Sequence, residues 1–529
     1  MSKLQLLLKT LIITSLAVLP MANSARILGV FPYPSKSHMT VFSTLTRELA
    51  RRGHEMVVVS SFPLSKPMLN YTDIDIMDVM APLHEIIFNA DVYDFADFSL
   101  YMIPTSLWDE GLAVTEAALT HPKINDLLKD NKGFDLIIAE AFIHEAIYGF
   151  AHHFKAPLIL ISSMNGMHWV NYVVGTPIPL SYFPNPMLTY TDHMTFSERI
   201  VNSVFTSLWD LGNQLHYLPR QEALKKAVFG ESCASISELE KSVSLVLLNN
   251  HLSLNFPRPL VPSMIDAGGM HVSTTTSELP NDIKKFLDDA KEGVIYFSMG
   301  SNLRSDKMPA EKLEAFMNAF SEIPQRVLWK WESDEFPGKP RNVKVSKWLP
   351  QQDILAHRNV KLFITHGGLL SLQEAAYHGV PLIGIPVYGD QMLNMKKAVL
   401  GGYGVMVTLQ NVTKQSLLWA LDKTLNDPSI SMEAKRRSSL FRDQPESPLD
   451  RAVFWTEYVL RHKGAHHLRT AATELAWYQL NLLDVAAVLL GALLLSFFVL
   501  RTFARLVFCK PTIELKNNNN EKRLHKKRK

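Results

Sequence analysis

The sequence predicts an α/β protein with two doubly wound, Rossmann-like domains that face each other across a cleft, followed by a C-terminal transmembrane helix. Short, fully apolar segments recur in both halves of the chain with helical stretches between them. This pattern is typical of parallel strands that are buried on both faces of a sheet. A chain of 529 residues with 47% hydrophobic content is also long enough to form two such domains.

The N-terminus has the composition of a secretory signal peptide over residues 1–24. An apolar run at residues 11–21 follows two lysines and leads to small residues at 22–24, which suit cleavage. A buried first strand is the alternative interpretation. Residues 26–31 supply a better strand directly afterwards, which favours the signal peptide.

The first domain is predicted at residues 25–272. Its apolar segments are expected to form parallel strands at residues 27–31, 55–60, 135–139, 156–161 and 244–248. A helix is expected from Met39 to Arg52, because Gly53 is a residue type that commonly ends helices. The loop between the first strand and this helix contains His38.

A polar linker is predicted at residues 273–284, and a second domain with the same plan at residues 285–445. Its strands are expected at residues 293–298, 326–330, 343–345, 360–365 and 381–385. Further helices are expected at residues 446–481. In such sheets ligands bind beyond the carboxyl ends of the strands, so polar residues that directly follow strands are the candidates for chemistry.

Residues 482–500 form an apolar run that is long enough to cross a bilayer as a helix. Trp477 and Tyr478 precede this run, and the tail at 501–529 carries ten Lys and Arg against two Glu. This asymmetry predicts a single-pass type I membrane protein, with a luminal body and a cytosolic tail. The endoplasmic reticulum is the expected membrane, because the end of the chain resembles a retrieval signal of its membrane proteins. Because the basic excess belongs to the tail, a nucleic-acid-binding body is not supported.

The last four residues, 526–529, resemble a dilysine retrieval signal, and a simple positive anchor is the alternative. Cys233 and Cys509 lie on opposite sides of the apolar run, so no intrachain disulfide is expected. Palmitoylation of Cys509 is conceivable, although an idle thiol explains it as well. Asn70 and Asn411 lie in glycosylation tripeptides, which fit a luminal body.

The segment from Trp348 to Gln391 holds the residues that a nucleotide sugar requires. Small residues after His366 open a helix, where a phosphate can approach free backbone N–H groups and the positive end of the helix dipole. The Trp348 indole offers a stacking face for a base, and the Glu374 carboxylate can accept two hydrogen bonds from a ribose. A tight strand-to-helix turn with a core tryptophan is the structural alternative.

In residue identity and spacing, this segment resembles the donor-binding signature of the animal, membrane-bound UDP-glycosyltransferases, the insect type included. A second stretch, residues 461–485, resembles the same family. The resemblance implies the GT-B fold, in which the first domain binds the acceptor, the second binds the UDP-sugar, and the C-terminal helices return toward the first domain. It implies UDP-sugar contacts from Ser301, Trp348, Gln351, His366, Gly368, Ser371, Glu374, Asp390 and Gln391.

Within that set, the resemblance implies Trp348 on the uracil and Gln351 near the base, with Asp390 and Gln391 on the sugar. One position departs from the family pattern. Leu370 stands where many members carry a polar or small residue that contacts phosphate. We expect Ser371 to compensate through its hydroxyl or its backbone N–H.

The expected catalytic residues are His38 and Glu140. A histidine suits the removal of a proton from an acceptor hydroxyl, and a carboxylate on its other ring nitrogen would fix the tautomer. Glu140 follows a predicted strand, where the family usually has Asp, so its longer side chain has to fold back to reach His38. Asp135 and Glu145 are the alternative partners.

The resemblance implies an inverting transfer of a hexose from a UDP-sugar to a hydroxyl of a small lipophilic acceptor. Glucose is the first choice of sugar and glucuronate the second. No metal and no cofactor are expected, since the UDP-sugar is a co-substrate, and a homo-oligomer is left open. The alternatives are an inactive carrier of lipophilic ligands or UDP-sugars, and a transferase that acts on lipid or glycan acceptors.

Overall fold

A computed structural model of the chain describes residues 24–88, 93, 102–336 and 338–508. Residues 1–23 of the predicted signal peptide and residues 509–529 of the basic tail, with Cys509 and the dilysine motif, lie outside the described residues. The chain forms two compact units, Met1–Thr473 and Glu474–Lys529. We call the first unit the body, and the two units are described separately.

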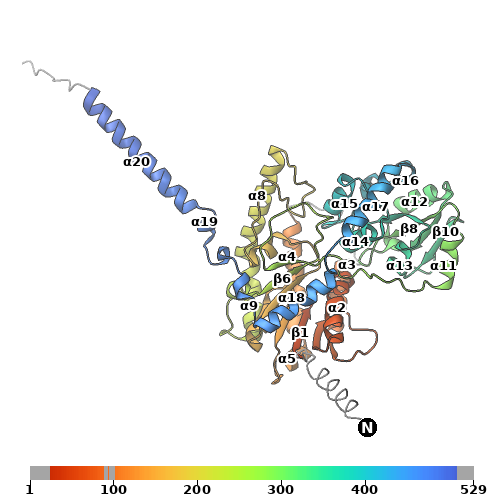
Figure 1. The fold of residues 1–529 in the computed structure, drawn as a ribbon, viewed down its shortest axis with the longest axis horizontal. Coiled ribbons are helices and arrows are strands. Elements are labelled where there is room, and N and C mark those ends of the chain that lie inside the picture. Colours follow the sequence, from red (N-terminus) through yellow and green to blue (C-terminus); the bar gives the residue numbers. More distant parts are fainter. Residues whose placement is uncertain (1–23, 89–92, 94–101, 337, 509–529) are drawn as a thin grey trace, which may run out of the picture. The chain divides into compact units, whose positions relative to one another are not determined.

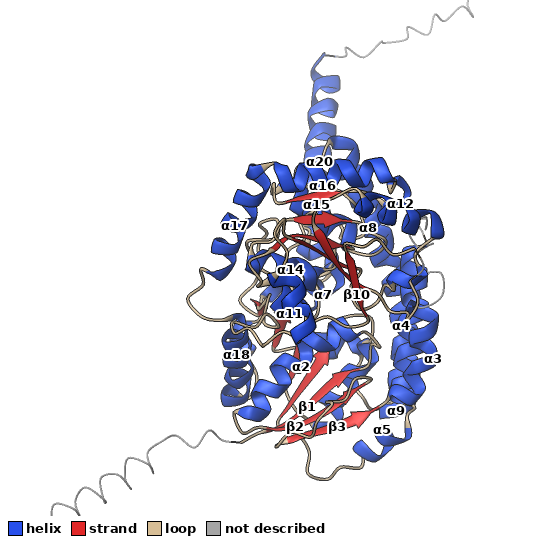
Figure 2. Cartoon of the chain, turned by 90° about the vertical axis from the view of Figure 1, so that its right-hand side faces the viewer, coloured by secondary structure: helices blue, strands red, loops and turns tan. Residues whose placement is uncertain are grey.

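The body contains two parallel sheets, which Figure 2 shows in red among the surrounding helices. The first sheet has seven strands in the order β3-β2-β1-β4-β5-β6-β7. The strands are β1 (Arg26–Phe31), β2 (Glu55–Ser60), β3 (Tyr71–Asp75), β4 (Leu136–Glu140), β5 (Leu158–Ser162), β6 (Leu245–Leu248) and β7 (Met264–Asp266). The strand order reverses between β1 and β4, which creates a crevice at their carboxyl ends.

Helices connect the strands of the first sheet and cover it, and α2 and α18 lie beside β1 in Figure 1. They are α2 (Lys36–Arg51), α3 (Met77–Phe88), α4 (Ile103–Leu119), α5 (Pro122–Leu127), α6 (Gly149–Phe154), α7 (His168–Val173), α8 (Phe196–Gly212), α9 (Leu218–Phe229) and α10 (Ile236–Ser242). The predicted helix 39–52 is therefore real but begins at Lys36. His38 lies in its first turn, not in the preceding loop, because Ser35 takes the extended N-cap position.

The second sheet has six strands in the order β10-β9-β8-β11-β12-β13. Its strands are β8 (Val294–Ser298), β9 (Arg326–Lys330), β10 (Val343–Ser346), β11 (Val360–Thr365), β12 (Leu382–Gly384) and β13 (Gly404–Met406). Its helices are α11 (Asn281–Asp288), α12 (Ala310–Ser321), α13 (Gln351–Leu355), α14 (Leu369–His378), α15 (Gln391–Leu400), α16 (Lys414–Asn426) and α17 (Pro428–Arg442). The order reverses between β8 and β11, so this sheet also has a crevice at the carboxyl ends of two central strands.

Strands β3, β7 and β13 were not predicted from the sequence. Strands β7 and β13 have three residues each and lie at sheet edges, and β3 carries two aspartates at its own edge. Such strands have neither the length nor the continuous apolar pattern of the central ones. The central strands, in contrast, agree with the predicted segments to within two residues at each end.

Helix α18 (Pro448–His462) crosses back to the first domain, as the family resemblance implied. Its buried residues Ala452, Val453 and Val459 belong to the apolar core formed by β1 and α2. The Arg52 guanidinium on the α2 side also donates to Asp450 at 2.8 Å. The C-terminal segment therefore closes the two domains into one body.

The second unit contains α19 (Trp477–Leu480) and α20 (Leu483–Phe508). Among the described residues, α20 is the helix that is long and apolar enough to cross a membrane, and its side chains are exposed along its whole length. It extends beyond the predicted span 482–500 and carries Arg501 and Arg505 in its last turns. Its 26 residues rise about 39 Å, whereas a bilayer core is about 30 Å thick.

Candidate active site

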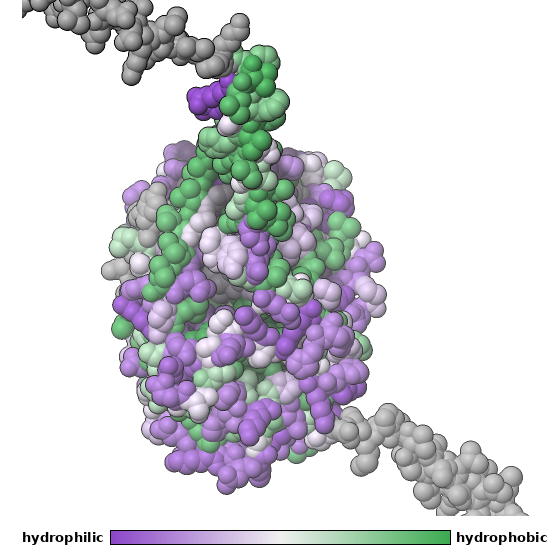
Figure 3. Space-filling view, turned by 90° about the vertical axis from the view of Figure 1, so that its left-hand side faces the viewer, coloured by the Kyte–Doolittle hydropathy of each residue, from purple (hydrophilic) through white to green (hydrophobic). Residues whose placement is uncertain are grey.

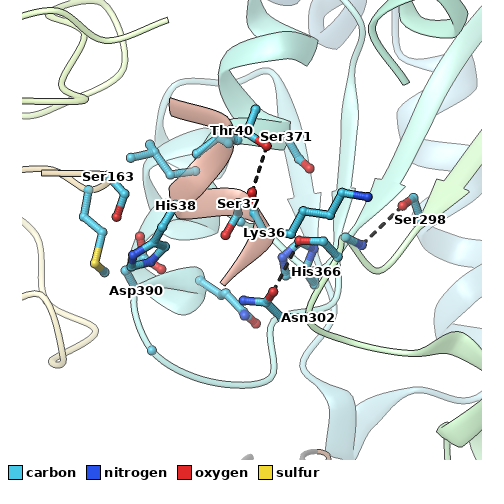
Figure 4. A pocket seen from close by; sticks show the side chains of 18 of the residues that line it. Lys36, Ser37, His38, Thr40, Ser163, Ser298, Asn302, His366, Ser371 and Asp390 are labelled. Carbon is cyan, nitrogen blue, oxygen red and sulfur yellow. Dashed lines mark hydrogen bonds between the residues drawn. The ribbon is translucent and has the colours of Figure 1, made fainter. Parts of the chain in front are cut away.

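A cavity of about 700 Å³ lies between the two sheets of the body. Its walls come from residues at the carboxyl ends of strands in both sheets, where doubly wound folds bind ligands. A cavity of this size suits a nucleotide sugar or a small organic molecule. Figure 4 shows side chains of both domains converging on it.

His38 and Glu140 meet in the wall that belongs to the first sheet. The Nδ1 atom of His38 lies 2.6 Å from Oε1 of Glu140, whose side chain is 1% exposed. Because β1 and β4 pair side by side, the first turn of α2 and the end of β4 lie next to each other. The carboxylate holds the proton on Nδ1, so the lone pair of Nε2 is left to accept a proton.

The two alternative partners of His38 lie elsewhere. The Asp135 carboxylate, just before β4, accepts the backbone N–H of Arg26 at 2.8 Å, at the opposite end of these strands. Glu145 is buried near Tyr217, where burial raises the pKa of its carboxyl to about 8. The structure therefore brings Glu140 to His38 and neither Asp135 nor Glu145.

The raised pKa of Glu145 predicts how the stability of the fold changes with pH. Its carboxyl ionises in the unfolded chain at the ordinary value of 4.5 but in the folded chain only near 8. Between these values the unfolded state releases a proton that the native state keeps, so stability falls by about 1.4 kcal/mol per pH unit as pH rises. Glu145→Gln should remove this loss and raise the melting temperature by several degrees at pH 8.

Scanning fluorimetry of the full chain in detergent at pH 5 and pH 8 checks this. The gain from Glu145→Gln over wild type should be much larger at pH 8 than at pH 5. Glu278→Gln, at an exposed position of the linker, is the matched control and should show no such difference. An equal gain at both pH values would contradict a protonated native Glu145.

A second carboxyl, which the sequence interpretation missed, faces the cavity from the first domain. Glu110 on α4 accepts a hydrogen bond from the Tyr33 hydroxyl, and burial raises the pKa of Glu110 to about 7. The ring centroids of Tyr33 and His38 are 4.9 Å apart. Around these residues the wall is apolar and is formed by Ile87, Phe88, Ile103, Leu107, Phe142, Met164 and Met187.

In the second domain, His366 directly follows β11, and its ring lies in space between Gly300 and Gly368. A Cβ atom on Gly300 or on Gly368 would come within 2.4 Å of the His366 ring, so both positions require glycine. Burial, reinforced by the nearby charge of Lys330, lowers the pKa of His366 to about 4. The imidazole is therefore neutral at pH 7 and can offer one N–H donor.

Glu374 on α14 is held in a network at the cavity wall. Its Oε2 accepts from the Gln351 amide at 2.5 Å, and its Oε1 accepts from the Gln352 amide at 3.2 Å. His271, from the end of the first domain, places Nε2 3.5 Å from the same carboxylate. The Gln351 amide also donates to the Ser371 hydroxyl at 3.1 Å, so the predicted residues 351, 371 and 374 form one cluster.

Trp348 lies two residues beyond the end of β10 and is 58% exposed, which excludes the core alternative. Lys36 of the first domain places its ammonium 3.6 Å from the centre of the indole ring. Burial and the charge of Lys330 lower the pKa of Lys36. Lys36 and Lys330 both line the cavity, and neither was predicted as a site residue.

Asp390 and Gln391 follow β12 at the cavity wall, and Asp390 and His38 face the same part of the cavity (Figure 4). The Asp390 carboxylate accepts from the Asn394 amide at 2.9 Å, and burial raises the Asp390 pKa. The side-chain oxygen of Gln391 accepts from the backbone N–H groups of Val387 and Tyr388. Gln391 therefore fixes the loop and keeps only its amide N–H groups for a ligand.

Ser301, a predicted site residue, and Leu370, the position that departs from the family pattern, occupy different surroundings. Ser301, after β8, lines the cavity and donates to Asn302, which in turn donates to the Ser35 hydroxyl across the cleft at 3.2 Å. Leu370 packs against the apolar core of the first domain. This packing gives a physical reason for a hydrophobic residue at the position that departs from the family pattern.

Two parallel-sheet domains with a nucleotide-sized cavity at their carboxyl edges define a GT-B glycosyltransferase. Among solved structures, the chain is similar to a glycosyltransferase, VinC, in complex with DTDP (TM-score 0.57, 14% identity, 83% of this chain and all of that one). It is also similar to the glycotransferase of kitacinnamycin (TM-score 0.54, 17% identity, 82% and 99%). At these identities the likeness establishes the fold.

The family described as "UDP-glucoronosyl and UDP-glucosyl transferase" matches residues 27–517. The chain is 40% identical to UDP-glycosyltransferase UGT5 of Dactylopius coccus, over 96% of this chain and 99% of that protein. It is 32% identical to UDP-glucuronosyltransferase 2A3 of Mus musculus, over 89% and 90%. The chain belongs to the UDP-glycosyltransferase family and is an enzyme that uses a UDP-sugar donor, and its C-terminal apolar helix fits a membrane anchor.

Proposed function

We propose that the enzyme moves a hexose from its UDP-sugar to a hydroxyl group of a small lipophilic acceptor, with inversion at the anomeric carbon. His38 removes the acceptor proton, and the oxygen attacks opposite the leaving UDP. The observation that carries this proposal is the His38–Glu140 contact of 2.6 Å in the cavity wall beside Asp390. The apolar lining near Tyr33 favours a lipophilic acceptor over a charged one.

On the donor side, the proposal gives each polar group one part of the UDP-sugar. Trp348 stacks on the uracil, with Gln351 at the base edge and Glu374 on the ribose hydroxyls. His366 and the backbone N–H groups at Gly368 and Ser371 receive the diphosphate. Asp390 and Gln391 bind the sugar hydroxyls. Because His366 is neutral, the positive charge that stabilises the departing diphosphate comes from Lys36 and Lys330.

Glucose is the favoured sugar and glucuronate the second choice. The similar UDP-glucosyltransferase 2 of Dactylopius coccus, 38% identical over 89% of this chain, is named for glucose. We further propose a type I orientation in the endoplasmic reticulum membrane with the body in the lumen. The exposed positions of Asn70 and Asn411 are compatible with glycosylation there.

The test uses microsomes that contain the full chain, several UDP-sugars and a panel of phenols and aliphatic alcohols. The expected result is transfer with UDP-glucose ahead of UDP-glucuronate, giving β-linked products from the α-linked donors. An α-linked product would contradict the inverting mechanism. Retained UDP-sugar binding without turnover of any acceptor would favour the inactive carrier.

Trp348→Ala should weaken binding of the UDP-sugar donor and leave the rate of the chemical step nearly unchanged. Stacking of a base on an aromatic side chain is worth about 1–3 kcal/mol, so KM for the UDP-sugar should rise about 10- to 100-fold. Steady-state kinetics at saturating acceptor measure this. Trp419→Ala, on the outer side of α16 and 53% exposed, is the matched control and should keep the wild-type KM. A fall in kcat alone would place Trp348 outside the donor site.

A further inference from the structure

Helix α8 carries a long apolar surface that no part of the described chain covers. Its first residue and five positions spaced along it are exposed large hydrophobic side chains, as is Leu215 just after its end: Phe196, Ile200, Val201, Val204, Leu208, Leu211 and Leu215. Over residues 196–215 the other exposed positions hold only Ser197, Ser207 and Gln214, so no exposed residue is charged. We call the surface of these seven hydrophobic side chains the α8 face.

The α8 face is continuous along the helix. At 3.6 residues per turn, the apolar residues from Phe196 to Leu211 fall within an arc of about 140°. The opposite side is buried in the first domain, where Trp209 stacks on Trp169 at 5.5 Å between ring centres. Figure 3 shows hydrophobic surface gathered in a green band on the face of the body that carries α8.

Helix α8 is held firmly by its buried side. Thr195 closes the N-terminus with a capping box, and the Asn202 amide donates to the carbonyls of Leu180 and Phe183. Exposure of the α8 face is therefore a fixed property of the folded body. An apolar surface of this extent on a soluble domain marks a site of contact with a partner or a membrane.

The place where the chain leaves the body lies close to α8. A Cβ on Gly175 would come within 2.6 Å of Thr470 Cγ2 and 3.2 Å of Thr473 Cγ2, so the last residues of the body touch the loop after α7. From α7, the Tyr172 hydroxyl donates to Asp210 of α8 at 2.7 Å. Helix α8 is thus a near neighbour of the chain exit.

The anchor helix begins only ten positions after this exit. An extended chain of that length spans at most about 35 Å, so the bilayer surface cannot be far from Thr473. Tethering keeps the effective concentration of lipid near α8 high without any further affinity. Helices with one apolar side and one polar side commonly lie in the interfacial region of a bilayer.

We propose that the α8 face is a second membrane contact of the enzyme, which lies in the headgroup and acyl boundary of the lipid bilayer. The body is then held at the membrane by two elements, α20 across the bilayer and α8 on its surface. This contact brings the first domain, which forms the apolar wall of the cavity, to the surface where lipophilic molecules partition. The proposal does not depend on which sugar or acceptor the enzyme uses.

The first test measures contact with lipid in the full chain. A single cysteine is introduced as Leu208→Cys in a Cys233→Ser, Cys509→Ser background, labelled with an environment-sensitive dye, and reconstituted in nanodiscs with brominated lipids. Dye at position 208 should be quenched about threefold more than dye at the control position Trp419→Cys. Equal quenching at both positions would overturn the proposal. Cross-linking of position 208 between two copies, without lipid quenching, would also overturn it and identify a subunit interface.

The second test removes the anchor after reconstitution. A specific protease site is inserted between Thr473 and Trp477, and the chain is cleaved in proteoliposomes. The cleaved wild-type body should stay with the vesicles, whereas the Val204→Asp, Leu208→Asp variant should be released about tenfold more. Both substitutions lie on exposed positions, so transfer by the uncleaved variant is the control for folding. Equal release of both bodies contradicts a membrane contact at α8.

Discussion

Replacing His38 with Ala should lower kcat by about 10²- to 10⁴-fold for every acceptor hydroxyl that the enzyme uses. In the proposed mechanism the His38 imidazole accepts the proton as the glycosidic bond forms, and the Ala side chain cannot. Donor binding should persist, because the proposed function places the base, the ribose and the diphosphate in the second domain. Product formation under single-turnover conditions measures the first effect, and titration of UDP against the protein measures the second.

A matched control is available in the same domain. His121 also pairs with a carboxylate, with Nε2 3.0 Å from Asp78, but it lies outside the cavity. His121→Ala removes a helix cap and should cost stability of about 1 kcal/mol, while kcat stays near the wild-type value. A His38→Ala enzyme that keeps more than about one tenth of wild-type kcat would show that another group is the base.

The residues that the sequence could place are those that directly follow central strands. Glu140 ends β4, His366 follows β11, and His38 lies in the first turn of the helix after β1, so a prediction of the strands also predicts the edge at which these residues emerge. The direct contact between His38 and Glu140 is a consequence of the strand order in the first sheet. The pairing of β1 with β4 brings His38 and Glu140 together, and one sequence does not reveal that order.

The residues that the sequence analysis missed depend on packing between distant segments. Lys36 reaches Trp348 only because the two domains close on each other, and Glu110 faces the cavity because α4 packs across the end of the first sheet. Lysines and glutamates are also the least informative residues in a pattern, since most of them are solvated surface groups. Their burial, and not their spacing, distinguishes Lys330 and Glu110 as site residues.

Leu370 shows how a departure from a family pattern can have a structural cause. Leu370 lines the cavity, and the structure also packs its side chain against the core of β1 and α2. Ser371 is buried next to it, and its hydroxyl accepts from Gln351. The hydroxyl is thus part of the network of Gln351 and Glu374, so the proposed contact of Ser371 with the diphosphate has to come from its backbone N–H.

Glu140→Gln should lower kcat by about 100-fold while the affinity for UDP-sugar stays the same. The amide keeps the shape of the side chain but cannot stabilise the imidazolium that forms when His38 takes the proton, and a hydrogen bond to a charged group is worth about 1.5–3 kcal/mol. Glu140→Asp should lose less, about tenfold, because the carboxylate remains but withdraws by about one bond length from Nδ1. Single-turnover rates of the two variants measure these effects.

The double variant His38→Ala, Glu140→Gln decides whether the carboxylate acts through the histidine. Glu140 Oε1 contacts His38 at 2.6 Å, and its other oxygen has no hydrogen-bond partner among the described residues. Once His38 is gone, the carboxylate has no imidazolium to stabilise, so the double variant should be no slower than His38→Ala alone. If the double variant is instead slower by the full factor of about 100, Glu140 contributes independently of His38 and the two residues do not form a catalytic pair.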